Sequence, residues 1–235
     1  MGEVTMSANN QSAQGGDNHI NLYEPHVWKH HTKVAGLEWK NPVGTASGTF
    51  QYAAVRWFYD VSQLGAVCTK GASPVPWEGN PSPRTAESPA ANINAVGLQN
   101  PGIDHYLAED LPKLKAAGAF VISNVAGHCD DDYAAVVEKL ADSDADMLEI
   151  NVSCPNVHGG GMSFGTDPKA AAAVTRAVKD AVQKPVIVKL SPNVTSIADI
   201  AKACEDAGAD AVSLINTVLG MRIDLRCKKP LLANK

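Results

Sequence analysis

One cysteine of this chain has neighbours that are typical of a reactive group. Cys154 lies in EINVSCPNVHGGG, residues 149–161, between a predicted buried strand and a glycine-rich loop. A thiol there can act as a nucleophile, a metal ligand or a proton acceptor, or can simply pack in a core. No nearby histidine forms a recognisable dyad with it, and its polar neighbours are amides rather than metal ligands. Packing, proton abstraction and nucleophilic attack therefore stay open, and no metal site is predicted.

Polar or flexible residues also follow most of the other predicted strands. They are Ala46-Ser47-Gly48, Lys70-Gly71, Asn124, Asn151, Lys189 and Asn216-Thr217. In a β/α barrel the carboxyl ends of the strands converge on one mouth, where the active site lies. Such residues can also be plain caps and turn formers, but their recurrence at successive strand ends favours a site.

The two lysines at strand ends indicate the charge of a ligand. Lys70 and Lys189 would be costly to bury without a partner, and a carboxylate, a phosphate or an electron-rich cofactor ring could satisfy them. The alternative is that both are solvated at loop starts. Asparagine amides supply donors and acceptors that suit a flat heterocycle; they stand at positions 94, 100, 124, 151, 156 and 216.

Short apolar strands alternate with helical patterns along the chain. We predict strands near 43–46, 66–70, 120–124, 147–151, 186–190 and 211–216. We predict helices over 56–65, 104–118, 131–146, 166–183 and 196–210, with Asp167 as an N-cap, Pro168 in the first turn and Gly208 closing the last helix. The proline-rich segment 72–102 shows no helical pattern, follows the strand with Lys70, and can fold over the mouth.

This rhythm predicts an α/β fold with a parallel sheet. An open doubly wound sheet is weakened by the absence of G-x-G-x-x-G after the first strand. We therefore expect a (β/α)8 TIM barrel, here with about six βα units present. Residues 1–32 are predicted to be a disordered leader, and residues 33–235 the incomplete barrel.

The bulk properties exclude several classes of protein. The 235 residues carry a net charge of -5, so no basic surface indicates nucleic acid. No apolar run is long enough to span a membrane, and the N-terminus has no secretory h-region. The five cysteines include no C-x-x-C pair, which argues against a disulfide framework or a zinc site and favours a cytoplasmic protein.

Several motifs together resemble those of one enzyme family. They are NVSCPNV, GGGMSFGTDP, ASGTF, TKG, GNPSPRTAE, NAVGLQNPG, VKLSPNV and INTVLGMRIDL. The chain from about residue 33 onward resembles the catalytic subunit of class 1 dihydroorotate dehydrogenases, and FGTDP and RIDL resemble the NAD-linked subclass 1B. The resemblance implies a TIM barrel of the FMN-binding type. It also implies oxidation of (S)-dihydroorotate to orotate in de novo pyrimidine (UMP) biosynthesis.

The resemblance also implies roles for individual residues. Cys154 would be the catalytic base that removes the C5 proton while hydride passes to FMN. The substrate would be bound by Lys70, Asn94, Gly97, Leu98, Asn151, Asn216 and Thr217. FMN would be bound by Ser47, Lys70, Gly71, Asn124, Asn151, Lys189 and Ile215. Lys189 would stabilise the reduced anionic ring, and the glycines at 159–161 would form a gate.

Partners follow from the same resemblance. We expect a homodimer and an electron-transfer subunit that carries FAD and an iron–sulfur cluster, with no nucleic acid and no membrane. The family's last two strands, whose loops cradle the FMN phosphate, are not in the sequence, so we expect weak FMN retention. A dihydropyrimidine dehydrogenase-like flavoenzyme, similar around NVSCPN, and a non-catalytic barrel fragment are the alternatives.

Overall fold

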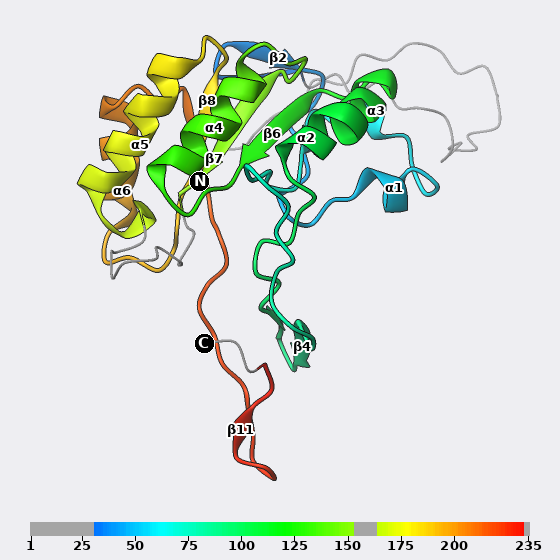
Figure 1. Cartoon of the computed structure of the whole chain (residues 1–235), viewed down its shortest axis with the longest axis vertical. Coiled ribbons are helices and arrows are strands. Elements are labelled where there is room, and N and C mark those ends of the chain that lie inside the picture. The colour runs from blue at the N-terminus through cyan, green and yellow to red at the C-terminus, as the bar shows by residue number, and fades with distance from the viewer. Residues whose placement is uncertain (1–30, 153–163, 233–235) are drawn as a thin grey trace, which may run out of the picture.

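A curled, parallel five-stranded sheet forms the centre of the molecule (Figure 1). The computed structural model describes residues 31–152 and 164–232. The strands lie in the order β3 (Val67–Cys68), β6 (Val121–Val125), β7 (Met147–Asn151), β8 (Val186–Lys189) and β9 (Ala211–Ser213). All four pairings are parallel. This half-barrel confirms the predicted β/α barrel class.

Helices cover the outer face of the sheet (Figure 1). Between β3 and β6 a short α2 (Ile103–His105), a π-helical turn η2 (Tyr106–Asp110) and α3 (Leu111–Ala116) run on continuously. The later helices each join two neighbouring strands: α4 (Asp130–Ala141), α5 (Pro168–Ala181) and α6 (Ile197–Asp206). Their apolar faces and the outward residues of the strands, such as Leu148 and Val188, form the larger hydrophobic core.

The ends of these helices follow the predicted sequence signals. Asp167 Oδ1 accepts a hydrogen bond from Lys169 N over 3.2 Å, and Pro168 occupies the first turn of α5. Ser196 Oγ accepts from Asp199 N over 3.3 Å at the start of α6, and Gly208 follows that helix with a φ of 101°. These caps confirm the predicted starts of α5 and α6.

A second, smaller apolar cluster fills the inner side of the sheet. Ala66, Ile122, Met147 and Ile187 form it with Cys68. The antiparallel hairpin of β1 (Thr32–Val34) and β2 (Leu37–Trp39) packs against this cluster, with the Trp39 and Phe120 rings 5.8 Å apart. The hairpin therefore covers the end of the sheet where the strands begin.

Two antiparallel hairpins extend from the carboxyl side of the sheet (Figure 1). The first, β4 (Thr85–Ser88) with β5 (Ala91–Asn94), belongs to the segment 72–102. The second pairs β10 (Ile223–Asp224) with β11 (Lys229–Pro230). Arg222 Nη1 donates to the carbonyl oxygen of Glu87 and joins the two hairpins. We call the first hairpin and its flanking residues 78–99 the arm.

Two predicted elements are wrong. Residues 43–46 form no strand, and only Gly44 makes a β-bridge, to Ala66. The reason is that the Thr45 hydroxyl accepts a hydrogen bond from Cys68 N over 2.9 Å and donates one to the Cys68 carbonyl oxygen over 3.1 Å, in place of main-chain pairing. The helix predicted over 56–65 is replaced by α1 (Tyr52–Val55) and a 3₁₀ turn η1 (Val61–Gln63). There Asp60 Oδ1 accepts from Ser62 N and starts a new turn, which interrupts the helix.

The predicted division of the chain at residue 32 lies at the edge of the described residues. The predicted leader, residues 1–32, lies outside the described residues except for its last two positions, and Thr32 begins β1. The division at residue 32 stays a prediction. In the described part of the chain, the helices are too short or too polar to cross a membrane.

Candidate functional site

A hollow of about 210 Å³ opens at the carboxyl ends of the strands. Its lining combines the turn after residue 45 with the end of β8 and the segment after β9: Ala46, Ser47, Thr49, Lys189, Ile215, Asn216 and Thr217. Five of these seven are residues that the sequence assigned to a cofactor or a substrate. Segments more than 140 residues apart in sequence therefore meet here.

Asn151 lies beside this hollow and is held on two sides. Asn216 Nδ2 donates to Asn151 Oδ1 over 2.9 Å, and the Tyr133 hydroxyl donates to the Asn151 carbonyl oxygen over 2.6 Å. Asn216 N in turn donates to the Leu190 carbonyl oxygen over 3.0 Å. These contacts connect the segment after β9 to the ends of β7 and β8, so both asparagines have defined positions.

Lys70, Gly71 and Asn124 form the other side of the mouth. Lys70 is half-buried, and burial lowers the pKa of its ammonium group from the ordinary value. Its Nζ lies close to Gly48, since a methyl group built there would be 3.8 Å away. A methyl group on Gly71 would lie 2.6 Å from Asn124 Oδ1, so only glycine leaves this amide in place.

The sequence reasoning missed a buried carboxylate below these residues. Glu149, 5% exposed, accepts hydrogen bonds from three neutral side chains on three other strands. The donors are Asn124 Nδ2 at 2.7 Å, Ser213 Oγ at 2.7 Å and Cys68 Sγ at 3.2 Å. The signal was present in MLEIN, where a single acid interrupts an apolar strand. Such an acid is seldom buried unless it is paired.

The substrate residues predicted on the arm lie apart from this hollow. Asn94 ends β5, and Gly97 and Leu98 follow it with φ angles of 74° and 54°. Asn100 Nδ2 donates to the Leu98 carbonyl oxygen over 2.8 Å. Asn100 Oδ1 meanwhile accepts from Ser73 Oγ at 2.7 Å. The base of the arm is therefore fixed, but these three residues do not line the hollow.

The predicted base, Cys154, lies outside the described residues, as do Asn156, His158 and the glycines at 159–161. The described part of β7 ends at Asn151, three positions before Cys154. The role of this cysteine and of the glycine gate therefore stays a prediction. Among the residues that the structure does describe, no group of three or more His, Cys, Asp or Glu side chains is arranged to hold a metal ion.

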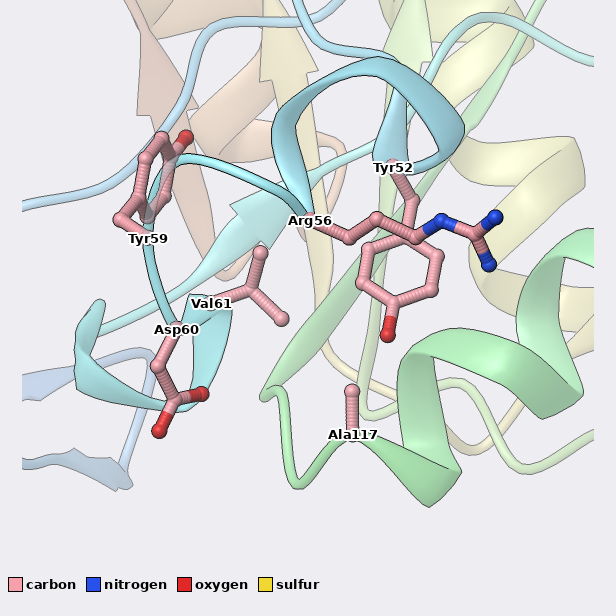
Figure 2. A pocket seen from close by; sticks show the side chains of 6 residues that line it. All are labelled: Tyr52, Arg56, Tyr59, Asp60, Val61 and Ala117. Atoms are coloured by element: carbon pink, nitrogen blue, oxygen red, sulfur yellow. The ribbon is translucent and has the colours of Figure 1, made fainter.

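A second hollow, of about 280 Å³, lies beside α1 and contains none of the predicted residues. Its lining is Tyr52, Arg56, Tyr59, Asp60, Val61 and Ala117. Figure 2 shows Tyr52 directed towards Ala117, while the side chains of Arg56 and Tyr59 extend away from each other. No convergent set of polar groups forms here, so chemistry is centred on the hollow at the strand ends.

Comparison with known proteins identifies the family of the chain. The family model described as dihydroorotate dehydrogenase matches residues 29–235. The chain belongs to the dihydroorotate dehydrogenase family. It is 54% identical over 205 residues to the protein named dihydroorotate dehydrogenase B (NAD(+)), catalytic subunit, of Alkaliphilus metalliredigens (strain QYMF). That match covers 86% of this chain and 67% of the relative.

Two further relatives carry the same name. The proteins of Alkaliphilus oremlandii (strain OhILAs) and Listeria monocytogenes serovar 1/2a (strain ATCC BAA-679 / EGD-e) are 51% and 49% identical to this chain. Each match again covers 86% of the chain and 67% of the relative. The resemblance to the NAD-linked subclass of dihydroorotate dehydrogenases, seen in the sequence motifs, is therefore confirmed.

Proposed function

We propose that this chain is the catalytic subunit of an FMN-dependent enzyme that oxidises (S)-dihydroorotate to orotate in pyrimidine biosynthesis. The observation that carries the proposal is the hollow at the strand ends. Ser47, Lys189 and Ile215, all expected to bind cofactor, line it together with Asn216 and Thr217, which are expected to bind substrate. A cofactor and a substrate that react must share one site, and this arrangement supports that requirement.

The chemistry of the described residues fits a flavin. Lys189, only 9% exposed, lines the hollow, and its positive charge would complement an electron-rich ring bound there. Asn124 and Asn151, buried at the mouth, offer amide groups suited to a ring with alternating carbonyl and N–H groups. Ser47, Lys70, Gly71, Asn124, Asn151, Lys189 and Ile215 would hold FMN. When bound, FMN supplies the acceptor for the hydride from substrate C6.

The chain's own residues would perform the remaining steps. Lys70, with its ammonium group at the mouth, would pair with the substrate carboxylate. Asn94, Gly97 and Leu98 from the arm, with Asn151, Asn216 and Thr217 from the sheet, would hold the ring in place. The Cys154 thiolate would take the proton from C5, so that loss of one proton and one hydride leaves the C5–C6 double bond.

Electrons must then leave the subunit. The relatives are named as NAD(+)-linked catalytic subunits, and a catalytic subunit implies at least one other subunit. We propose that a partner with FAD and an iron–sulfur cluster takes up the electrons, and that two copies of the catalytic subunit associate.

Anaerobic reduction tests the proposal. The protein is loaded with FMN, and the flavin absorbance is followed while (S)-dihydroorotate or dihydrouracil is added. We expect dihydroorotate to bleach the flavin and dihydrouracil to leave it oxidised, because only the former has a carboxylate for Lys70. Bleaching by dihydrouracil would favour the dihydropyrimidine dehydrogenase-like alternative. Failure of both to bleach bound flavin would favour a non-catalytic barrel fragment.

A further inference from the structure

The carboxylate of Glu149 lies between the smaller apolar cluster on the inner side of the sheet and the polar residues at the mouth. It is directed into the barrel, where side chains from β3, β6 and β9 reach it. The residues beneath it, Ile122, Met147 and Ile187, belong to the inner apolar cluster. A charge in such a place is tolerated only if its oxygens are satisfied, and the three hydrogen bonds to Glu149 do this.

A carboxylate can accept hydrogen bonds but has none to donate. The amide of Asn124, 2.7 Å from Glu149 Oε1, must therefore turn its NH₂ group towards Glu149. Its carbonyl oxygen then points the opposite way, and Asn124 Oδ1 indeed lies against Gly71 at the mouth. The orientation of this amide is thus a consequence of the neighbouring acid.

The other two donors keep Glu149 an acceptor. Burial raises the pKa of the Cys68 thiol well above its ordinary value, and the nearby Glu149 carboxylate raises it further. Cys68 therefore stays protonated and donates to Glu149 Oε1. Ser213 Oγ donates to the second oxygen, Oε2. All three groups therefore donate to Glu149, and Cys68 and Asn124 share the oxygen Oε1.

We infer that Glu149 is a positioning residue that fixes the Asn124 amide so that the mouth presents a hydrogen-bond acceptor at this point. For the identity of the ligand the inference rests on the proposed FMN function. The oxidised flavin ring has a single N–H group, at N3, so this is the ring atom that an acceptor can recognise. Glu149 therefore selects a flavin with a free N3–H over one that is methylated there.

Two substitutions separate the shape of Glu149 from its ability to accept. Glu149→Gln keeps an acceptor oxygen for Asn124 and Cys68, while its amide nitrogen can donate to Ser213 Oγ. Glu149→Met has a similar volume, but its thioether is only a weak acceptor. Glu149→Asp keeps the charge but moves the carboxylate away from its donors by one methylene group. It replaces Glu149→Met in the test if the Met variant does not fold. Ser213→Ala is the matched control, because it removes one bond to Glu149 and leaves Asn124 untouched.

The first measurement needs no ligand. Nuclear magnetic resonance of the ¹⁵N-labelled protein gives the hydrogen-exchange rate of the Asn124 side-chain amide, assigned by its loss in Asn124→Ser. We expect slow exchange in the unsubstituted protein, Glu149→Gln and Ser213→Ala, and exchange at least about tenfold faster in Glu149→Met or Glu149→Asp. Equal exchange rates in all of these proteins would overturn the inference.

The second measurement compares the dissociation constants of FMN and 3-methyl-FMN by fluorescence titration. One neutral hydrogen bond changes affinity roughly 2- to 10-fold. In the unsubstituted protein, the dissociation constant of 3-methyl-FMN should therefore exceed that of FMN by at least about twofold. The preference should persist in Glu149→Gln and Ser213→Ala and approach one in Glu149→Met or Glu149→Asp. An unchanged preference in those last two variants would refute the role assigned to Glu149.

The two measurements distinguish this inference from the proposed function. If neither flavin binds while exchange at Asn124 still depends on Glu149, the flavin proposal fails and the positioning of Asn124 stands. If FMN binds and is reduced by dihydroorotate but neither readout depends on Glu149, the positioning role fails alone.

Discussion

Asn216 Nδ2 donates to Asn151 Oδ1 over 2.9 Å, which ties the segment after β9 to the carboxyl end of β7. Ile215 and Thr217, the neighbours of Asn216, line the hollow, whereas Asn151 is buried beside it. The Tyr133 hydroxyl holds Asn151 from the other side. The hydrogen bond between Asn216 and Asn151 therefore fixes the lining of the hollow relative to the sheet.

Removing the hydrogen bond between Asn216 and Asn151 should weaken cofactor binding. In Asn216→Ala, the segment 215–217 loses a side-chain anchor, and we expect the dissociation constant of FMN to rise about 5- to 10-fold, the worth of one or two neutral hydrogen bonds. Fluorescence quenching on titration with FMN measures it. Asn92→Ala, on the arm, is the control and should bind FMN as the unsubstituted protein does. An unchanged affinity in Asn216→Ala would contradict the prediction.

Gly71 should tolerate no side chain. A methyl group there would lie 2.6 Å from Asn124 Oδ1 and 3.1 Å from Ala126 Cβ, so Asn124 would have to move. We expect Gly71→Ala to weaken FMN binding at least tenfold and to cost about 1–3 kcal/mol of stability through overpacking. Isothermal calorimetry and urea unfolding test both. Gly220→Ala, where a methyl group meets nothing within 4 Å, should change neither quantity.

The arrangement of strands and helices was largely predictable, because periodicity and caps are local signals. Asp167, Ser196 and Gly208 mark helix ends through contacts with residues one to three positions away. The strand predicted at 43–46 does not form, and the reason is a non-local contact. Thr45 uses its hydroxyl to bond the main chain of Cys68, 23 residues away, and no local pattern encodes that choice.

The site was predictable by residue type but not by its connections. Strand-end position alone selected Ser47, Lys189 and Asn216, which the structure brings to one hollow. Glu149 was missed because its partners come from three other strands, and only the fold brings them within reach. An acid within an apolar strand is a signal for such a network, although it does not name the partners.

Tyr106 should make the stability of the protein depend on pH in alkaline solution. Burial raises the pKa of its phenol from 10.0 to about 12, and the hydroxyl shares a hydrogen bond with Ser123 Oγ. Because the folded-state pKa lies above the unfolded one, its contribution is complete below pH 10 and is lost as the pH rises towards 12. The loss amounts to about 2–3 kcal/mol.

Urea unfolding between pH 8 and about 11.5 measures this dependence. We expect Tyr106→Phe to lose less stability over that range than the unsubstituted protein, because the variant has no phenol at this position. Tyr59→Phe, at an exposed position, should keep the slope of the unsubstituted protein. Identical slopes in Tyr106→Phe and Tyr59→Phe would contradict the assignment.

Arg84 should control the arm rather than the cofactor. Its guanidinium donates to the Asn80 carbonyl oxygen, to the Glu78 carbonyl oxygen at 2.9 Å and to Gln99 Oε1. Lysine cannot reproduce this planar set of donors. In Arg84→Lys we expect the KM for dihydroorotate to rise about 3- to 10-fold, because Asn94, Gly97 and Leu98 lose their support, with FMN affinity unchanged.

Steady-state kinetics with a flavin-reducible dye separate these effects. Arg176→Lys makes the same change at an exposed position of α5 and should leave the KM unaltered. A loss of FMN affinity in Arg84→Lys, with the KM unaltered, would instead connect the arm to the cofactor.

Cys154 is expected to act on the substrate and not on the cofactor. Its thiolate would remove the C5 proton, and general base catalysis of this kind contributes roughly 10²- to 10⁴-fold to the rate. In Cys154→Ala we therefore expect flavin reduction by dihydroorotate to slow by that factor, while the dissociation constant of FMN changes less than about twofold. Stopped-flow absorbance under anaerobic conditions measures the rate. Cys129→Ala replaces an exposed thiol and should keep the original rate. Nearly full activity in Cys154→Ala would assign the base to another group, whereas loss of FMN from that variant would make the cysteine part of the cofactor site.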